Sequence, residues 1–337
     1  MAQDSLKLHW ASCMAPDAIG NAYGYRVHHE TLKRYVSKIA DITEDSPDAF
    51  MIMPPEYYRH RIPDKRNWLY TMFEGTTLPE LYRKSIQKAD YLLVPSVWVK
   101  ELFHQYFDPD RVFVISHGVE SDFTYKKRRF PKDRPFRFLW VGAPNPRKGF
   151  QEVAAAWDAV FKKSAAVELY IKTTRVEGVK KNGNVILDGR NMSRRELIKL
   201  HHSAHCFIAC SRGEGFHLCL AEAMRTGTPC VATCYSGMLD FFDDSVGYSI
   251  GYKMGPGVLK FVGDNFEHET EIAFPYVDHL AEKMVDVFIN YKQAVKKGKA
   301  ASCRIMRKFT WERSAQTLVD IIRNVQEAEA NSGRKVG

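Results

Sequence analysis

The sequence predicts an α/β protein built from two doubly wound domains, each with a parallel sheet covered by helices. Two observations support this class. Short apolar runs with the length of buried strands alternate with longer segments of helical spacing, a pattern typical of strand–helix–strand crossover units. The alternation is interrupted once, by a basic stretch with two prolines over residues 126–135, and then restarts. We therefore expect a first domain over residues 1–130 and a second over residues 131–310, facing each other across a cleft.

Five apolar or aromatic runs predict the strands of the first domain, at residues 8–11, 50–53, 68–73, 91–94 and 112–115. Two of the intervening segments place their apolar residues on one helical face. The first segment carries Tyr25, Leu32, Tyr35, Val36 and Ile39, and the second carries Val99, Leu102, Phe103 and Tyr106.

The pattern restarts at residue 136 and predicts the strands of the second domain, at residues 136–141, 167–171, 184–187, 206–209 and 229–232. Helices are predicted over residues 149–161, 193–203, 218–226, 276–297 and 311–330. We expect the last helix to pack back on the first domain. Ligands of such domains bind at the carboxyl ends of the strands.

Composition excludes several classes of protein. Of the 337 residues, 45% are hydrophobic and 26% are charged, which argues against disordered and fibrous chains. No apolar run approaches the roughly 18 residues of a membrane span, and the N-terminus lacks a secretory apolar segment. The seven cysteines form no Cys-x-x-Cys pair, which favours free thiols in a reducing compartment. We expect a cytoplasmic protein, or one that is peripheral at a membrane surface.

Charge is unevenly distributed along the chain. The sequence contains 49 basic and 40 acidic residues, a net charge of +9. Residues 1–130 carry 18 basic and 17 acidic residues, a net charge of +1, so +8 falls on the remainder. This excess would attract a phosphorylated small molecule, a nucleic acid or an anionic membrane surface. Basic residues scattered for solubility explain it equally simply.

Residues 211–229 carry the strongest chemical pattern. A buried strand is followed by a turn with Gly213 and Gly215 and then by a helix. Backbone N–H groups at such a helix start, together with the helix dipole, suit a diphosphate. Glu214 and Glu222 are eight residues apart, so both could face one cleft, one toward a sugar and one toward a ribose. The spacing alone leaves open that both are solvated charges beside an ordinary turn.

This segment resembles the Glu-x7-Glu signature of family 4 glycosyltransferases with the GT-B fold. Further segments resemble the family's motifs in the same order, at residues 94–100, 114–120, 140–150 and 309–312. The resemblance covers about residues 66–325 and implies two Rossmann-like domains, a nucleotide-sugar donor in the second, and retention of anomeric configuration.

The resemblance also implies roles for individual residues of the second domain. Arg147 and Lys148 would bind the donor's diphosphate, and their charge would stabilise the leaving group as the glycosidic bond breaks. Glu222 would bind the ribose hydroxyls, and Glu214 would lie near the transferred sugar. The segment that would reach the phosphates and the sugar comprises Gly215, Phe216, His217 and Leu218.

The first domain offers weaker candidates. Gly20 and Gly24 lie where the family places a glycine-rich loop over the donor phosphates, and a plain turn is the alternative. Glu74 follows a predicted strand and would act as a base or hydroxyl anchor for the acceptor, or it caps the next helix. His117 stands where the family usually has Asn, so we expect it to be structural or to line the cleft. The first domain is also short for the family, which leaves the acceptor open.

The sequence as a whole predicts an enzyme, a hexosyltransferase that uses a UDP- or GDP-linked sugar. Asp108 and Asp110 form an Asp-x-Asp pattern around a proline, which indicates a turn rather than a metal site. We expect no metal and no cofactor. The acceptor would be a glycan, a lipid-linked hydroxyl or a modified nucleic acid. The alternatives are a phage-type enzyme acting on modified DNA bases, with basic residues 126–129 and 194–195 on phosphates, and a non-catalytic nucleotide-sugar-binding module.

Overall fold

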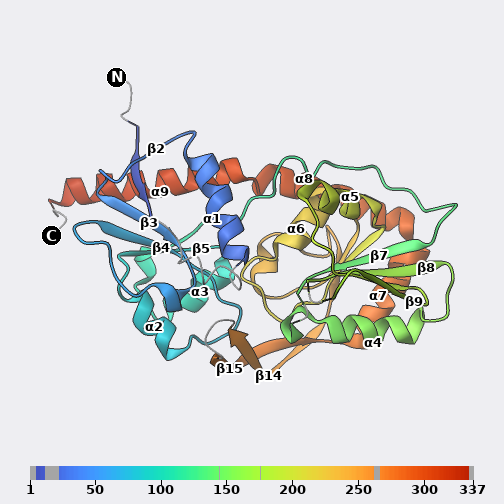
Figure 1. The fold of residues 1–337 in the computed structure, drawn as a ribbon. Helices are drawn as coiled ribbons and strands as arrows, with labels where there is room; N and C mark the ends of the chain where they lie inside the picture. The colour runs from blue at the N-terminus through green and yellow to red at the C-terminus, as the bar shows by residue number, and fades with distance from the viewer. Residues whose placement is uncertain (1–4, 12–22, 144, 175, 262–265, 334–337) are drawn as a thin grey trace. The chain divides into compact units, whose positions relative to one another are not determined.

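The computed structural model describes residues 5–11, 23–143, 145–174, 176–261 and 266–333, and the chain forms two compact units (Figure 1). Unit 1 comprises Met1–Gly118, Gly257–Thr270 and Phe309–Gly337. Unit 2 comprises Val119–Pro256 and Glu271–Lys308. Each unit contains a parallel sheet with helices, so the predicted α/β class is confirmed.

The sheet of unit 1 has six strands in the order β2-β1-β3-β4-β5-β6, and all neighbours run parallel. The strands are β1 (Lys7–Trp10), β2 (Asp41–Ile42), β3 (Asp48–Ile52), β4 (Arg66–Tyr70), β5 (Tyr91–Val94) and β6 (Val112–Val114). Strands β3 and β4 are buried along their whole length because they lie inside the sheet with both faces covered. The order reverses between β1 and β3, where doubly wound sheets of this type bind ligands.

The described part of unit 1 contains four α-helices, namely α1 (Tyr23–Val36), α2 (Glu80–Ile86), α3 (Val97–His104) and α9 (Trp311–Ser332). Helices α1 and α9 pack against each other and run beside the strands (Figure 1). Trp311, Leu318 and Ile322 of α9 lie in the same buried cluster as Leu8 and Phe50 of the sheet. The last helix of the chain thus completes the core of unit 1.

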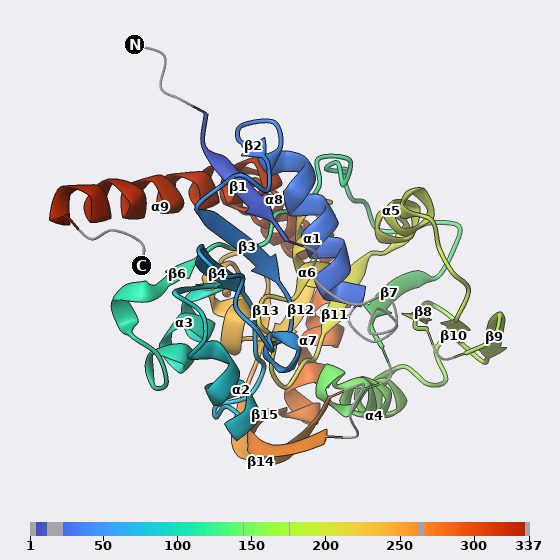
Figure 2. The same ribbon diagram turned by 60° about the vertical axis from the view of Figure 1, so that its left-hand side comes forward.

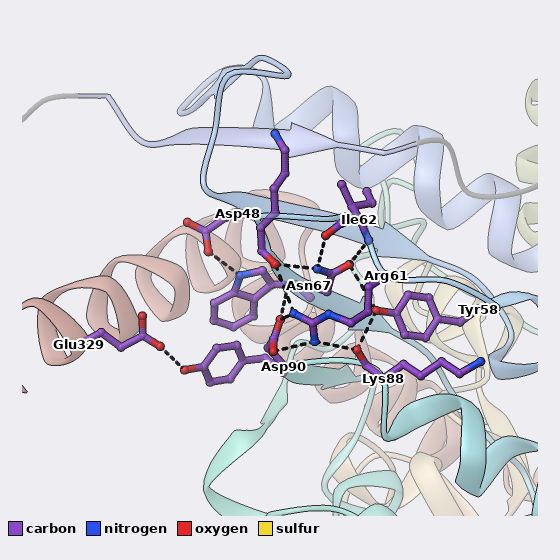
Figure 3. Close-up of polar contacts among 11 residues, drawn as sticks. Asp48, Tyr58, Arg61, Ile62, Asn67, Lys88, Asp90 and Glu329 are labelled. Atoms are coloured by element: carbon purple, nitrogen blue, oxygen red, sulfur yellow. Dashed lines mark hydrogen bonds and ion pairs between the residues drawn. The ribbon is translucent and has the colours of Figure 1, made fainter. Parts of the chain in front are cut away.

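A polar network around the buried side chain of Asn67 lies at the amino ends of β4 and β5 (Figure 3). The Asn67 side chain accepts a hydrogen bond from the Ile62 amide at 2.8 Å, and Asp90 accepts both from the Asn67 amide and from Arg61. Glu329 of α9 accepts from the Tyr91 hydroxyl at 2.7 Å. The buried Asn67 side chain is thus hydrogen-bonded, as a stable interior requires.

The sheet of unit 2 has seven strands in the order β13-β12-β11-β7-β8-β10-β9. The strands are β7 (Phe136–Val141), β8 (Val167–Lys172), β9 (Val179–Asn182), β10 (Val185–Asp188), β11 (Cys206–Ala209), β12 (Cys230–Thr233) and β13 (Tyr248–Ile250). All neighbours are parallel except β9, which runs antiparallel to β10 at the outer edge (Figure 2). Without β9 this is the Rossmann order, and its reversal lies between β7 and β11.

Five helices belong to unit 2, namely α4 (Phe150–Val160), α5 (Arg194–Ser203), α6 (Leu218–Arg225), α7 (Val277–Ile289) and α8 (Tyr291–Lys308). The single helix predicted over residues 276–297 was wrong. The chain leaves the helical conformation at Asn290, which has φ −99° and ψ 36°, and a second helix continues to residue 308.

Two features at the borders of the units were not predicted. Strands β14 (Tyr252–Phe261) and β15 (Phe266–Pro275) form a two-stranded sheet of their own. Residues 119–130, which the sequence analysis grouped with the first domain, belong to unit 2. The physical reason is Arg128, which is buried and donates hydrogen bonds to the carbonyls of His201, His202 and Ala204.

Candidate active site

The switch point of the unit 2 sheet brings two distant loops together. Strands β7 and β11 are neighbours, so the loops that leave their carboxyl ends start side by side. Gly149 has φ +69°, and a Cβ at this position would lie 1.7 Å from the carbonyl oxygen of Cys210. Only glycine therefore allows the first loop to pack against the end of β11. The Asn145 side chain accepts from the Arg147 amide at 2.9 Å and fixes the turn before it.

Arg147, Lys148 and Glu214 form a compact charged group at this switch point. The Arg147 Nη1 and Glu214 Oε2 atoms are 3.0 Å apart, and the Lys148 Nζ and Glu214 Oε1 atoms are 2.6 Å apart. Glu214 is only 5% exposed. Burial alone would raise the pKa of its carboxyl, but the charges of Arg147 and Lys148 hold it well below its usual range. The structure thus places a buried carboxylate between two cations.

A second segment supports Glu214 from the opposite side. The Glu214 amide donates to the Ser236 hydroxyl at 2.9 Å, and the Gly237 amide donates to the Glu214 carbonyl at 3.0 Å. A Cβ on Gly237 would lie 2.0 Å from the carbonyl oxygen of Gly215, so this contact requires glycine. Sequence reasoning missed Ser236 and Gly237. The Tyr235-Ser236-Gly237 turn directly after β12 was the one available signal.

The turn after Glu214 leads into α6 through His217. This residue has φ +80°, and its Nδ1 atom accepts from the Leu220 amide at 3.2 Å, which caps the helix. Burial lowers the pKa of His217 to about 4, so the ring is neutral at pH 7. Phe216 is 2% exposed and packs against Phe241 with ring centroids 4.8 Å apart. The side chain of Phe216 is thus part of the core of unit 2.

Glu222 lies apart from the two cations, inside α6. Its nearest charged or titratable partner is His201 of α5, with Nε2 and Oε2 3.8 Å apart. Burial lowers the pKa of His201 to about 3, so this ring is neutral and the contact is no ion pair. Burial raises the pKa of Glu222 to about 8, against the opposing charge of Arg194. Among the residues that the structure describes, none donates a hydrogen bond to the side-chain carboxyl of Glu222.

The candidates of unit 1 are less defined. Glu74 follows β4 and is half-buried, and its charge helps to raise the pKa of Tyr25 after the larger effect of burial. Gly24 lies exposed in the first turn of α1, and Gly20 lies outside the described residues. His117 is buried, and its ring centroid is 4.1 Å from that of His28. The roles predicted for these residues stay predictions.

Comparison with solved structures shows that the chain shares its fold with several glycosyltransferases. HepE of Anabaena, solved in complex with UDP-glucose, is 12% identical, with a TM-score of 0.66 over 95% of this chain and 100% of that one. Sucrose-phosphate synthase of Thermosynechococcus elongatus is 15% identical, with a TM-score of 0.65 over 94% and 81% of the two chains. TarM is 19% identical, with a TM-score of 0.58 over 86% and 57%.

The sequence identifies the family within this class. A model described as family 4 glycosyltransferase in conflict systems matches residues 96–318, which is more than half of the chain. The protein belongs to this family, so the predicted family resemblance and the predicted enzyme class are confirmed. No curated protein matches the sequence.

Two further properties of the described residues concern membrane spans and metal ligands. No helix among the described residues is both long and apolar enough to cross a membrane. Over the same part of the chain, no three His, Cys, Asp or Glu side chains lie together in a way that would hold a metal ion.

Proposed function

We propose that the protein transfers a hexose from a UDP- or GDP-linked sugar to a hydroxyl acceptor, with retention of configuration and without a metal ion. The observation that carries this proposal is the pairing of Arg147 and Lys148 with buried Glu214 at the Rossmann switch point. Ligands of such sheets bind beside this point, and two fixed cations there match a diphosphate. The family's retaining chemistry supports the stereochemical part.

The reaction places new negative charge on the diphosphate as the bond to the sugar breaks. Arg147 and Lys148 supply positive charge at the position where a divalent ion would otherwise be needed. In the unliganded protein Glu214 balances both cations. A bound diphosphate would share them, and Glu214 would then be held beside the sugar, where it can orient a hydroxyl or stabilise the cationic centre. The backbone of residues 215–218 would bind the phosphates and the sugar.

Glu222 suits the ribose. It is an unpaired carboxyl on α6 with no hydrogen-bond donor among the described residues, so two vicinal hydroxyls would satisfy it. Its pKa of about 8 means that binding to the carboxylate strengthens as the pH rises toward that value. On the acceptor side we assign Glu74 as base or hydroxyl anchor, with Gly20 and Gly24 helping to close the site.

The relatives support the donor class. HepE and the pneumococcal GtfA were solved with UDP, and HepE also with UDP-glucose. The free state of the six described cysteines is in keeping with a reaction in the cytoplasm.

A thermal-shift screen against UDP-, GDP-, ADP- and CMP-linked sugars tests the proposal. A donor that binds the folded state raises the melting temperature, and the rise grows with the logarithm of the ratio of donor concentration to Kd. We expect a clear rise with a UDP- or GDP-linked sugar and a loss of this rise in Arg147→Ala. Stabilisation by neither nucleotide would refute the donor assignment.

A further inference from the structure

Helix α8 of unit 2 carries an unusual charge distribution. Its 18 residues contain seven basic side chains and no acidic one. The helix is held to unit 2 by an apolar face on which Tyr291, Ala294, Gly298 and Ile305 are buried. Because this face points inward, the basic residues are left for the sides and the outer surface.

Two of the basic residues stabilise the fold. Lys297 donates to the carbonyls of Asp244 and Gly247 at 2.6 and 2.8 Å. Arg304 forms a 2.7 Å ion pair with Asp243. These contacts explain why part of the positive charge is present.

The other five cations have no such contact, and four of them lie on one side of the helix. Lys292, Lys296, Lys299 and Arg307 are exposed, and none has a hydrogen bond or ion pair with another described residue. At 100° per residue they fall within an arc of about 80°, and at 1.5 Å per residue they span about 22 Å. We call these four residues the α8 stripe. It is a straight row of unpaired positive charge on a rigid element.

An exposed aromatic ring lies at the amino end of the α8 stripe. Phe130 is 49% exposed, and its ring centroid is 5.8 Å from that of Tyr291 and 5.5 Å from that of Phe288. The Phe130 ring thus packs against the rings of Phe288 and Tyr291, and the rest of it is exposed to solvent. Arg129 and Arg134 beside it are also exposed.

The basic runs suggested by the sequence do not provide such a surface. Arg128 is buried among carbonyls, and Lys126 donates to the carbonyl of His202 at 3.2 Å. Arg194 is paired with Glu120 at 3.0 Å and with Asp122 at 2.7 Å. Lys126, Arg128 and Arg194 of these runs therefore have contacts within the fold, whereas the four cations of the α8 stripe have none.

We infer that the α8 stripe and Phe130 form a docking surface for single-stranded nucleic acid, with phosphates on the four cations and a base stacked on the ring. At about 3.4 Å per nucleotide, 22 Å corresponds to roughly six nucleotides. Cations in a row with an aromatic side chain are the usual means of binding single strands. An anionic bilayer fits less well, because Met306 is the one large apolar side chain exposed among the described residues of α8.

This surface is separate from the donor site, so it can be tested whether or not the proposed function holds. The probe is a fluorescently labelled 20-nucleotide single-stranded DNA of mixed sequence, followed by anisotropy between 50 and 300 mM KCl. Four phosphate contacts predict that log K falls with log salt at a slope of about −3. The variant K292E/K296E/K299E should bind at least tenfold more weakly at 100 mM KCl, with a slope of about −1.

The matched control is K163E/K180E/K181E, which changes three exposed lysines elsewhere in unit 2 and lowers the net charge equally. The control changes the net charge by the same amount as the test variant but leaves the α8 stripe intact. Its affinity for DNA should therefore stay within about twofold of the wild type. Circular dichroism and melting temperature verify that both variants fold. Equal losses in the two variants, or absence of DNA binding by the wild type, would overturn the inference.

Two additional measurements distinguish a nucleic-acid partner from a membrane. Phe130→Leu keeps an apolar side chain against Phe288 and should weaken single-stranded DNA about fivefold while leaving duplex binding unchanged. An unchanged affinity for single strands would refute stacking. Vesicles with 30% phosphatidylserine should bind more weakly than the oligonucleotide, and stripe-dependent binding to vesicles that DNA does not displace would show the partner to be a membrane.

Discussion

The two units bury polar groups in different ways. In unit 2 the switch point buries full charges, because Glu214 lies within 3.0 Å of Arg147 and of Lys148. Unit 1 buries, besides an ion pair, the two neutral rings of His28 and His117, which contact each other and Trp311. Burial lowers the pKa of both histidines, that of His117 to about 3, so they are neutral.

The difference shows where the protein accepts the cost of desolvated charge. A buried ion pair gains little stability over apolar side chains of the same volume, whereas removal of one partner is costly. In unit 1 the buried ion pair, Arg66 with Asp48 at 2.8 Å, lies at the amino ends of β3 and β4, away from the carboxyl ends where ligands bind. In unit 2 the three charges of Arg147, Lys148 and Glu214 lie where a charged leaving group is expected. A role in the reaction therefore explains these three side chains better than a contribution to stability does.

The largest effect is expected when the charged group of unit 2 is broken. Arg147→Ala removes one of the two cations that would stabilise the departing diphosphate, so turnover should fall by about 100-fold or more. Steady-state transfer or donor hydrolysis measures this. Arg304→Ala, which also breaks an ion pair in unit 2 but away from Glu214, is the control and should stay near wild-type turnover. Wild-type rates in Arg147→Ala would favour a non-catalytic module.

A second pair of variants separates the two glutamates of unit 2. Glu222→Ala should weaken UDP or GDP binding by about tenfold, because a ribose contact is lost. Glu214→Ala should chiefly lower turnover. Isothermal calorimetry and initial rates distinguish the two outcomes, and negligible effects of both substitutions would contradict the assigned roles.

The two buried, neutral histidines of unit 1 predict that its stability depends on pH in the acid range. Because the folded pKa of each buried histidine is depressed below the unfolded value of about 6.5, the unfolded state binds the extra protons. Stability is therefore lost as the pH falls below 6.5. Between pH 7 and pH 5, His28→Phe should reduce this loss by about 2 kcal/mol. Urea denaturation at both pH values measures it, and exposed His60→Gln, the control, should leave the loss as in the wild type.

The smallest effect concerns Glu222 in the absence of nucleotide. Its folded pKa of about 8 lies above the unfolded value, so its stabilising contribution is complete at low pH and is lost as the pH rises through 8. Glu222→Gln should therefore raise the melting temperature by about 3 °C or more at pH 8.5, and should leave it unchanged at pH 4. A rise of equal size at both pH values would point to packing instead. Exposed Glu282→Gln is the control.

Much of the fold could be predicted from local patterns. The inner strands are continuous apolar runs, so β4, β7 and β11 lie within a few residues of their predicted positions. Strand β14 was missed because Gly255, Pro256 and Gly257 interrupt it, and such residues normally indicate a turn. The break between α7 and α8 has no glycine or proline to announce it.

The candidate site was predictable in part for a similar reason. Arg147, Lys148 and Glu214 each follow a strand, and parallel strands end at one edge of the sheet. The contact of Glu214 with Ser236 and that of Glu222 with His201 depend on how α5, α6 and the turn after β12 pack. No local pattern encodes such distances, which is why these partners emerged only in three dimensions.

Arg128 also has a practical consequence for anyone who wishes to produce unit 2 alone. Its guanidinium fills a niche lined by three carbonyl oxygens at the end of α5 and by the hydroxyls of Thr226 and Thr228. A fragment starting at Phe136, where the sheet begins, would lack Arg128 and would leave these buried acceptors without their hydrogen-bond donor. A fragment that starts at Val119 retains Arg128 and its hydrogen bonds to the end of α5, where His201 lies.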